Sequence, residues 1–425
     1  MRNNEIGQPH WLSDALQRIG VVALRRGRVR AELLIALALT VICLGALISI
    51  GTLRSVDANN ASAISGGQTL TVMTRNLYLG GNIDRPIRAA YDRTGIEGVL
   101  ALGHANHELR DIVERTDFRT RSRLLADEIA AARPDLVGLQ EVALWRHGPL
   151  QLDKVGQLNA TEVDYDFLAI LLGDLSNSGI SYEVASIQQE SDVEAPAFTG
   201  NPLTGTAGEP EDVRLTDRDV ILLRSDSGIR IEGRGGGQYS TQFKVRLGNV
   251  TFPFVRGYAW ADVAIGSTTI RFLTTHLESQ SAKLAQAQAD ELLSGPAANA
   301  AVSTVIVCDC NSNPASPAAR APVPIGSGAA YRMLTKDHGF TDLWMQQPDR
   351  ADLGDTASLG ELVKDKAPDF ERRIDLVLAR PAPQVQIADS RAEVTGSELR
   401  DRDPATGLWP SDHAGVVVQL EVRPG

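Results

Sequence analysis

The sequence predicts an α/β (α+β) layered sandwich, in which β-sheets are covered by helices, preceded by one N-terminal transmembrane helix. The sandwich is predicted by short β-branched runs that alternate with helix-like stretches from Leu70 onward. The membrane helix is predicted by an uncharged apolar run from Leu33 to Ile50. Hydrophobic residues make up 43% of the 425 residues and charged residues 22%, which excludes a chain disordered throughout.

Seven strands and two helices are expected between residues 69 and 425. Each strand segment is a short run rich in β-branched and apolar residues. The expected strands are 70–76, 134–141, 219–225, 268–278, 303–311, 373–380 and 414–422. Residues 121–133 and 281–295 place apolar side chains on one helical face, and Gly295-Pro296 is a typical helix stop.

Residues 32–53 are expected to form a transmembrane signal anchor. The apolar run inside this segment is close to the roughly 20 residues that a spanning helix needs. Four arginines precede the run and only Arg54 follows it closely, so the positive-inside rule places residues 1–31 in the cytoplasm and the rest outside. The alternative is a signal peptide cleaved near Ala63, which would yield a secreted protein.

The segments after the anchor are predicted to be a linker and one catalytic domain. Residues 54–68 are small, polar and flexible in composition, and residues 69–425 form the domain. Two insertions are expected within it. Residues 77–118 are helix-like and suited to a cap, whereas 177–216 are rich in Pro, Gly and Thr and are expected to be a functional or mobile loop. The glycine-rich stretch 233–238 is expected to be a flexible hairpin turn and not a phosphate-binding loop.

The charge is unevenly distributed along the chain. The net charge is −11, and residues 1–32 carry +3 from six arginines and three acidic residues, which leaves −14 on the remainder. An acidic body disfavours broad electrostatic binding of nucleic acid. A local, metal-bridged phosphate site is compatible with that charge.

The three cysteines are too few for a disulfide framework or a four-cysteine zinc site. Cys43 lies inside the apolar run, and Cys308 and Cys310 flank Asp309. Because strand residues alternate faces, both sulfurs are expected to point away from Asp309. The sequence favours two packed thiols over a redox-sensitive pair, since a bond between cysteines two residues apart is expected to be strained.

Polar residues stand at the ends of most of the expected strands, where loops can converge on a small site. Each of these residues alone is weak evidence for function, because Asn, Asp and Glu are common at strand ends and turns. Their joint order is more informative. The residues are Asn76, Glu141, His276, Asp309, Asn311, Asp375, Asp412 and His413.

This order, N…QE…THLES…DxN…RIDLVL…SDH, resembles the endonuclease/exonuclease/phosphatase superfamily, which includes deoxyribonuclease I-like nucleases, sphingomyelinases and inositol phosphatases. The resemblance covers residues 70–423. It implies a four-layer α/β/β/α sandwich of two packed mixed sheets flanked by helices. It also implies a metal-dependent hydrolase that cleaves phosphate esters by in-line attack of a water.

The resemblance assigns a metal site to three residues. Glu141 matches the main Mg²⁺ carboxylate, with Asn76 beside it, and Asp412 is a further metal or water ligand. Hard divalent cations prefer oxygen ligands, and Mg²⁺ commonly takes only one or two protein carboxylates. Mn²⁺ or Ca²⁺ would also accept this ligand set.

The resemblance assigns the proton-transfer roles to three more residues. His413 matches the histidine that activates the attacking water, and Asp375 matches the carboxylate that orients it. Asp309 matches the acid that positions the nucleophile or protonates the leaving oxygen.

Charge stabilisation is assigned to Asn311 and His276, which match donors to the phosphorus in the transition state. Asp217 occupies the position of an acid near the strand-end histidine, and Asp219 is a competing candidate for that position.

The substrate class stays open at this level. Nucleic acid, a phospholipid headgroup and a small phosphate ester are all candidates, and no protein partner is predicted. The alternative function is a catalytically inactive surface-binding module of the same fold. Substrate choice is expected to depend on the two insertions.

Overall fold

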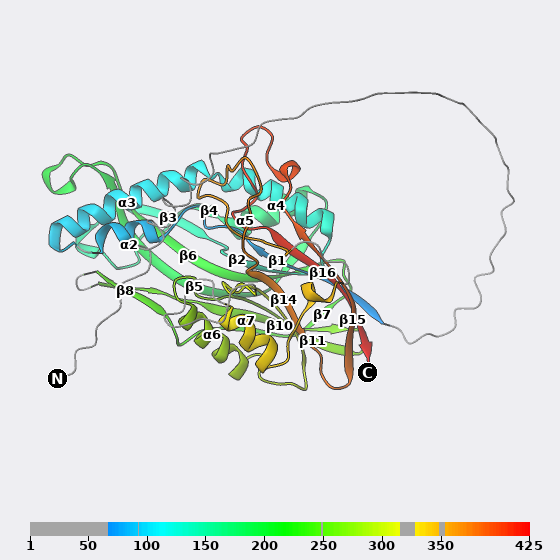
Figure 1. The fold of residues 1–425 in the computed structure, drawn as a ribbon. Coiled ribbons are helices and arrows are strands. Elements are labelled where there is room, and N and C mark those ends of the chain that lie inside the picture. Colours follow the sequence, from blue (N-terminus) through cyan, green and yellow to red (C-terminus); the bar gives the residue numbers. More distant parts are fainter. Residues whose placement is uncertain (1–66, 92, 248–249, 315–327, 348–352) are drawn as a thin grey trace, which may run out of the picture. The chain divides into compact units, whose positions relative to one another are not determined.

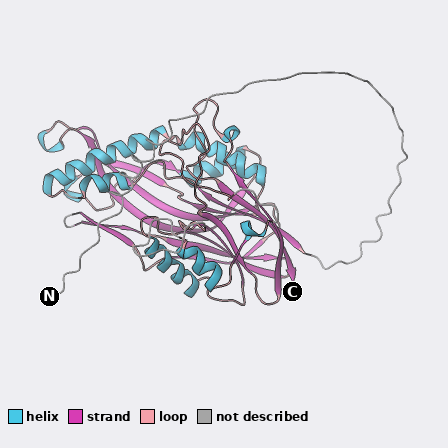
Figure 2. Cartoon of the chain, viewed as in Figure 1, coloured by secondary structure: helices cyan, strands magenta, loops and turns pink. Residues whose placement is uncertain are grey.

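Two mixed β-sheets pack face to face, and helices cover both outer faces (Figure 1). The computed structural model describes residues 67–425 except 92, 248–249, 315–327 and 348–352. Residues Ser65–Gly425 belong to one compact unit. The predicted layered α/β sandwich is therefore confirmed, and Figure 2 shows the helices outside the two strand layers.

The first sheet has eight strands, of which β1 and β2 run parallel to each other. The strand order is β15 (Val385–Thr395), β16 (Gly415–Pro424), β1 (Gln68–Asn76), β2 (Leu136–Gln140), β6 (Gly208–Arg224), β3 (Leu144–Pro149) and β4 (Glu162–Asp166), and β5 (Tyr182–Thr199) pairs with β6.

The second sheet has six strands, of which β11 and β12 run parallel to each other. The strand order is β13 (Thr341–Asp342), β14 (Asp375–Arg380), β12 (Ser303–Asp309), β11 (Thr268–His276), β10 (Gly257–Ile265) and β7 (Arg230–Gln238). A separate two-stranded ribbon consists of β8 (Phe243–Leu247) and β9 (Val250–Phe254).

The helices pack on the outer faces of the two sheets in two groups. The first sheet is covered by α2 (Asp84–Ala90), α3 (Gly95–Arg115), α4 (Phe118–Ala132) and α5 (Phe167–Asn177), and the second by α6 (Ala282–Ser294) and α7 (Ala329–Arg332). Helix α6 has the expected boundaries, because Ser281 caps its start by accepting a hydrogen bond from the Leu284 amide and Gly295 follows its end.

Hydrophobic residues from both sheets form the central core. Val72, Ile221 and Phe272 are fully buried in the cluster between the sheets. A second cluster lies between the first sheet and its helices, and a third lies beneath α6 and α7. Burial of this much apolar surface is the main stabilising contribution to the fold and makes the scaffold rigid.

The expectation of a loop at residues 177–216 is wrong. This segment contains β5 and the first half of β6, which pair from Tyr182 with Arg224 to Thr199 with Gly208. Bulges interrupt the register at three places and hide the period-two pattern. Ion pairs such as Arg214 with Asp192 place charged residues within the strands.

The expectation of a hairpin turn at residues 233–238 is also wrong, because these residues lie in strand β7. The glycines allow aromatic rings of β10 to lie close to the backbone. A Cβ atom at Gly235 would lie 2.8 Å from the ring of Trp260, and one at Gly237 would lie 2.7 Å from the hydroxyl of Tyr258. The aromatic rings of β10 pack directly on the glycine backbone of β7. These contacts stabilise a strand whose glycines have no side chains to pack.

Cys308 and Cys310 form a disulfide, so the expectation of two packed thiols is wrong. Their Cα atoms are 5.1 Å apart, within the ordinary range for a disulfide. The expectation that both sulfurs point away from Asp309 is confirmed, since both residues are buried in the cluster beneath α6 and α7.

The predicted anchor at residues 32–53 lies outside the described residues, as do the stub 1–31 and nearly all of the linker 54–68. Among the helices that the structure does describe, none combines the length and the apolar character that a membrane crossing requires.

Candidate active site

The predicted site residues converge at one edge of the sandwich, and they come from both sheets. The parallel strands β1 and β2 end together, with Asn76 opposite Gln140 and Glu141 next in the chain. The parallel strands β11 and β12 end in the same way, with His276 opposite Asp309. Asp375 begins β14 directly opposite Asp309. Because β16 runs antiparallel to β1, its first residues lie at the same edge.

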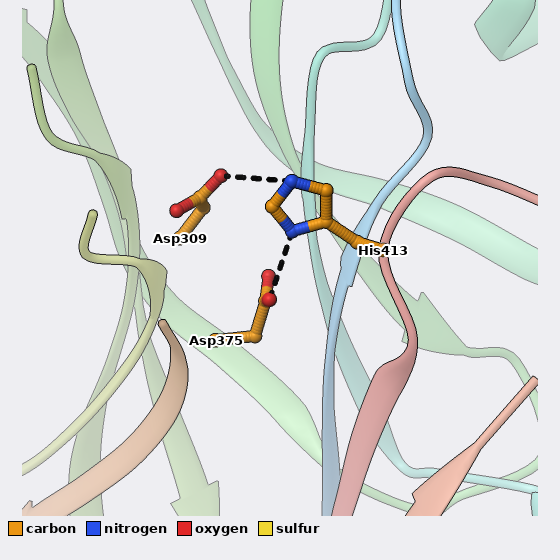
Figure 3. A group of neighbouring side chains, drawn as sticks. All are labelled: Asp309, Asp375 and His413. Carbon is orange, nitrogen blue, oxygen red and sulfur yellow. Dashed lines mark hydrogen bonds and ion pairs between the residues drawn. The ribbon is translucent and has the colours of Figure 1, made fainter. Parts of the chain in front are cut away.

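His413 lies between two carboxylates (Figure 3). Its Nδ1 is 2.9 Å from Asp375 Oδ2, and its Nε2 is 3.8 Å from Asp309 Oδ2. The hydroxyl of Thr356 also donates to Asp375 Oδ2 at 2.5 Å, which holds the carboxylate in place. Burial lowers the pKa of His413, but Asp375, Asp309 and Asp412 outweigh burial and raise that pKa well above its usual value.

The carboxylate of Asp309 is surrounded by donors. Asn76 Nδ2 donates to Oδ2 at 3.0 Å, and the backbone amide of Asn311 donates to Oδ1 at 3.1 Å. His276 Nε2 lies 3.3 Å from Oδ2. Burial raises the pKa of Asp309 to about 6, although His413 and these hydrogen bonds act to lower it.

His276 is a neutral donor whose tautomer is set by Arg256. Arg256 Nη1 lies 2.8 Å from His276 Nδ1, which must accept because a guanidinium can only donate. The remaining proton of the ring is therefore on Nε2, facing Asp309. Burial, together with Arg256 and His413, lowers the pKa of His276 well below its usual value.

Asp217 contacts this group through Arg256. Its Oδ2 is 3.3 Å from Arg256 Nη1, so it lies in the predicted region beside His276 but is joined to it by the guanidinium. Asp219, the competing candidate, instead faces Glu190, and both are buried. The geometry therefore favours Asp217 over Asp219 as the acid nearest the histidine.

Glu141 and Asp412 line one open cleft of about 300 Å³. The backbone of Glu141 is left-handed, with φ of 57°, a conformation that is uncommon outside glycine and frequent at functional sites. Glu141 Oε2 accepts the Leu79 amide at 2.8 Å. Burial and nearby Glu141 together raise the pKa of Asp412 to about 6, although His413 acts to lower it.

The oxygen donors at this cleft fit a hard divalent cation. Glu141 raises the pKa of Asp412, and a cation bound near both carboxylates would stabilise their charged forms. Asn76 lies at the same edge, and its Oδ1 accepts the Tyr78 amide at 2.8 Å. A carbonyl oxygen has a second lone pair, so this contact leaves Asn76 able to serve as a ligand.

A second set of ligand-type atoms is less suited to Mg²⁺. One ligand atom from each of Asp309, Asp375 and His413 lies within 4.8 Å of the others. Mg²⁺ usually keeps several waters, whereas both carboxylates here are about 1% exposed and already accept hydrogen bonds. The arrangement is better suited to proton transfer, because the imidazole can donate from Nδ1 and accept at Nε2.

Two functional-site residues were missed by the sequence analysis. Arg256 precedes β10 and orients His276, and Thr356 lies outside any strand and orients Asp375. Neither residue stands in a recognisable motif. The sequence analysis predicts no strand directly after Arg256, although β10 begins there, so no local signal marks this arginine.

Several solved structures are similar to this chain. An endonuclease/exonuclease/phosphatase family protein from Bacteroides thetaiotaomicron is 14% identical, with a TM-score of 0.48 over 84% of this chain and 98% of that chain. A mannosyl-6-phosphatase from the same species is 15% identical, with a TM-score of 0.47 over 83% and 99%. An endonuclease/exonuclease/phosphatase from Beutenbergia cavernae is 20% identical, with a TM-score of 0.45 over 84% and 72%.

A search of curated protein sequences finds no significant match. The family model is more informative, because it matches residues 111–413 and so includes every predicted site residue except Asn76. That match spans well over half of the chain, and this chain therefore belongs to the Endonuclease/Exonuclease/phosphatase family.

Proposed function

We propose that this protein hydrolyses phosphate esters with a water activated by His413 and with a divalent cation, Mg²⁺, held by Glu141, Asp412 and Asn76. Members of the family are phosphoesterases, and the matched segment contains nearly the whole site. The observation that carries the proposal is the hydrogen-bonded pair of Asp375 and His413, 2.9 Å apart, beside the buried carboxylate of Asp309.

His413 would act as the general base. Asp375 accepts the proton on Nδ1 and so leaves Nε2 to take a proton from water. Asp309 lies on the Nε2 side at 3.8 Å, where its carboxylate can hold the same water in line with the phosphorus. Asn311 is the expected donor for the charge that develops on the phosphoryl oxygens, whereas the one N–H of neutral His276 faces Asp309 and holds that carboxylate in place.

The proposed cation site is at the open side of the same edge. When bound there, Mg²⁺ would supply positive charge to the phosphate oxygens and offset the carboxylate field that raises the pKa of His413. Glu141 is held for this role by the Leu79 amide and by its left-handed backbone. Mn²⁺ or Ca²⁺ fits the same oxygen donors.

The test is a hydrolysis assay with Mg²⁺ and with a chelator. The substrates are plasmid DNA, RNA, bis-p-nitrophenyl phosphate, p-nitrophenyl phosphate and sphingomyelin. We expect chelator-sensitive turnover that is lost in His413→Ala and kept in the matched control His338→Ala, whose side chain is exposed. Folded protein that binds no Mg²⁺ and hydrolyses none of these esters would instead support the inactive binding module.

We also propose that the catalytic unit is held at the outer face of a membrane. The proposal is supported by the apolar run and its basic flank, and by the disulfide within the catalytic unit, since disulfides persist mainly in oxidising compartments. The test is fractionation with protease protection of the full chain. Recovery of the catalytic unit in the membrane fraction, cleavable from outside, is expected, and a protected unit would contradict the proposal.

A further inference from the structure

A small apolar pocket lies beside the catalytic cleft. It encloses about 50 Å³ between helices α2 and α3 and strands β3, β5, β6 and β9. Twelve of its fourteen lining residues are apolar. Ile83 and Phe254 line both the pocket and the cleft that contains Glu141 and Asp412. The pocket therefore adjoins the cleft that contains Glu141 and Asp412.

The two polar residues of the pocket are directed at the backbone. Asn106 Nδ2 donates to the carbonyls of Ala195 and Pro196 at 2.9 and 3.1 Å. Glu194 Oε2 accepts the amides of Asn159 and Ala160 at 2.8 and 2.9 Å. These groups hold the walls together, and the surface that remains for a ligand is chiefly hydrocarbon.

The indole of Trp145 is bound in the same way, since its Nε1 donates to the carbonyl of Leu79 at 2.9 Å. A sugar or nucleoside placed in this pocket would lose water from its hydroxyl groups without gaining equivalent partners. An alkyl group makes no hydrogen bonds to water that it could lose, and burial of its apolar surface against the wall would favour binding. The wall therefore selects for an apolar group.

We propose that this pocket binds the alkyl part of one ester group of the substrate, so that the preferred substrate is a phosphate ester of an aliphatic alcohol. This inference rests on the proposed function and names the substrate class for that same site. The volume has room for roughly three to five methyl-sized groups, taking about 10–15 Å³ for each probe-sized group. Short alkyl chains, or the first carbons of a longer chain, meet that limit.

Most residues that line the pocket come from the predicted cap and from the segment expected to be a loop. Ile83 and Ile87 come from the start of α2, Val193 and Ala195 from β5, and Phe254 from β9. The two insertions predicted at residues 77–118 and 177–216 thus meet at the pocket. Specificity for the alkyl group would reside in residues outside the proton-transfer and metal-binding sets.

The first experiment measures kcat/KM for a series of p-nitrophenyl alkyl phosphates, from methyl to hexyl, with Mg²⁺. Each added methylene that enters the pocket should raise kcat/KM about three- to fourfold, and the rise should stop when the pocket is full. A short-chain phosphatidylcholine below its micelle concentration distinguishes a lipid source of the chain from a simple alkyl ester. A kcat/KM that does not change with the length of the alkyl chain would overturn the proposal.

Two substitutions test the pocket directly. Ile87→Gln keeps α2 helical but makes the wall polar, and Ala195→Phe fills the space. Both should lower kcat/KM for the butyl ester about tenfold and leave the methyl ester unchanged. The control is Ile96→Gln, because Ile96 is 60% exposed and does not line the pocket. Equal effects on the methyl and butyl esters would contradict the inference.

A binding measurement separates failure of this inference from failure of the proposed function. Trp145 lines the pocket, so its fluorescence should respond more to hexyl phosphate than to methyl phosphate, and Ala195→Phe should remove the difference. If no ester is hydrolysed but this response is present, the proposed function fails and the pocket assignment stands. If the methyl ester is hydrolysed and the response is absent, only the pocket assignment fails.

Discussion

Asp309 is the residue at which the two polar chains of the site meet. One chain runs from Thr356 through Asp375 to His413, and the other from Asp217 through Arg256 to His276. Both histidines place Nε2 toward the same carboxylate oxygen, Oδ2 of Asp309. The two rings differ in charge, because three carboxylates surround His413 whereas Arg256 contacts His276. One imidazole is therefore suited to proton transfer and the other to hydrogen-bond donation.

Asp375→Asn should lower kcat by about 10²–10⁴-fold and change KM little. The substitution removes the charge that stabilises the His413 imidazolium, and it can turn the ring by offering a donor in place of an acceptor. Steady-state kinetics on bis-p-nitrophenyl phosphate measure the effect. Asp290→Asn on the exposed side of α6 is the control, and a variant that kept wild-type kcat would exclude the pair from the mechanism.

Glu190 and Asp219 face each other inside the sandwich, each no more than 2% exposed. In the described part of the chain, neither carboxyl group accepts a hydrogen bond from a residue outside this pair. Burial, and then the neighbouring carboxylates, raise the pKa of both groups well above the usual value. The two protonated carboxyl groups therefore contribute fully to the stability of the fold below about pH 4, the pKa that they have in the unfolded chain. This contribution is lost as the pH rises from there toward their higher pKa in the folded protein.

Glu190→Gln should consequently stabilise the protein at pH 8 by about 1–3 kcal/mol, because an amide can donate to Asp219 and carries no charge. Urea unfolding at pH 5 and pH 8 measures the free energy of unfolding of the wild type and the variant. The wild type should lose more stability than the variant between these pH values. Glu183→Gln, exposed on the same strand, should leave the pH dependence as it is, and an identical loss in Glu190→Gln would refute the explanation.

At the scale of elements, helix α4 joins the loops on either side of the site through one buried arginine. Arg121 donates to the carbonyls of Leu77 and Pro410 through Nη1, at 2.7 and 3.0 Å, and to that of Tyr78 through Nη2 at 3.1 Å. Its Nε donates to the Thr116 carbonyl at 2.8 Å. Burial lowers the pKa of Arg121 to about 10, so the group stays charged near neutral pH. The helix thereby positions the segments that follow Asn76 and precede Asp412.

Arg121→Met should destabilise the protein by roughly 3–5 kcal/mol, because it leaves four buried carbonyls without their donor. The free energy of unfolding in urea measures the loss. Arg123→Met, two residues along the helix and exposed, should change stability by no more than about 0.5 kcal/mol. Comparable stability of the two variants would show that Arg121 does not connect the loops as described.

At the scale of the whole molecule, the site exists only because the two sheets are packed together. Asn76 and Glu141 come from the first sheet, whereas His276, Asp309 and Asp375 come from the second. Binding of a cation at the first-sheet side should therefore stabilise the assembled sandwich and not its separate parts.

Mg²⁺ at about a hundred times its Kd should stabilise the wild type by about 2.7 kcal/mol, and a chelator should reverse the effect. Glu141→Gln should remove most of this stabilisation, since the cation loses a carboxylate ligand. Thermal unfolding of both proteins with and without Mg²⁺ measures the stabilisation by the cation. The control is Glu97→Gln on the exposed start of α3, and equal stabilisation of Glu141→Gln would place the cation elsewhere.

Much of the fold and of the site could be predicted from the sequence, because the signals involved are local. The strands that end in Asn76, Asp309 and their partners are short apolar runs, and α6 has its cap and its stop within fifteen residues. The β5–β6 hairpin was missed because its bulges break the local period. The disulfide was missed because sequence spacing alone does not report the separation of two Cα atoms.

The sequence by itself determined which residue types stand at the ends of the strands, and hence the chemistry that the edge of the sandwich can perform. Only the tertiary structure decided which of them touch. Asn76 and Asp309 are 233 positions apart in the sequence, yet Asn76 Nδ2 lies 3.0 Å from Asp309 Oδ2. Arg256 and Thr356 likewise reach the site only through contacts between distant segments. The apolar pocket likewise arises where α2, β5 and β9 meet. Strand-end chemistry follows from local periodicity, whereas contacts between distant segments follow from register and from the packing of the two sheets.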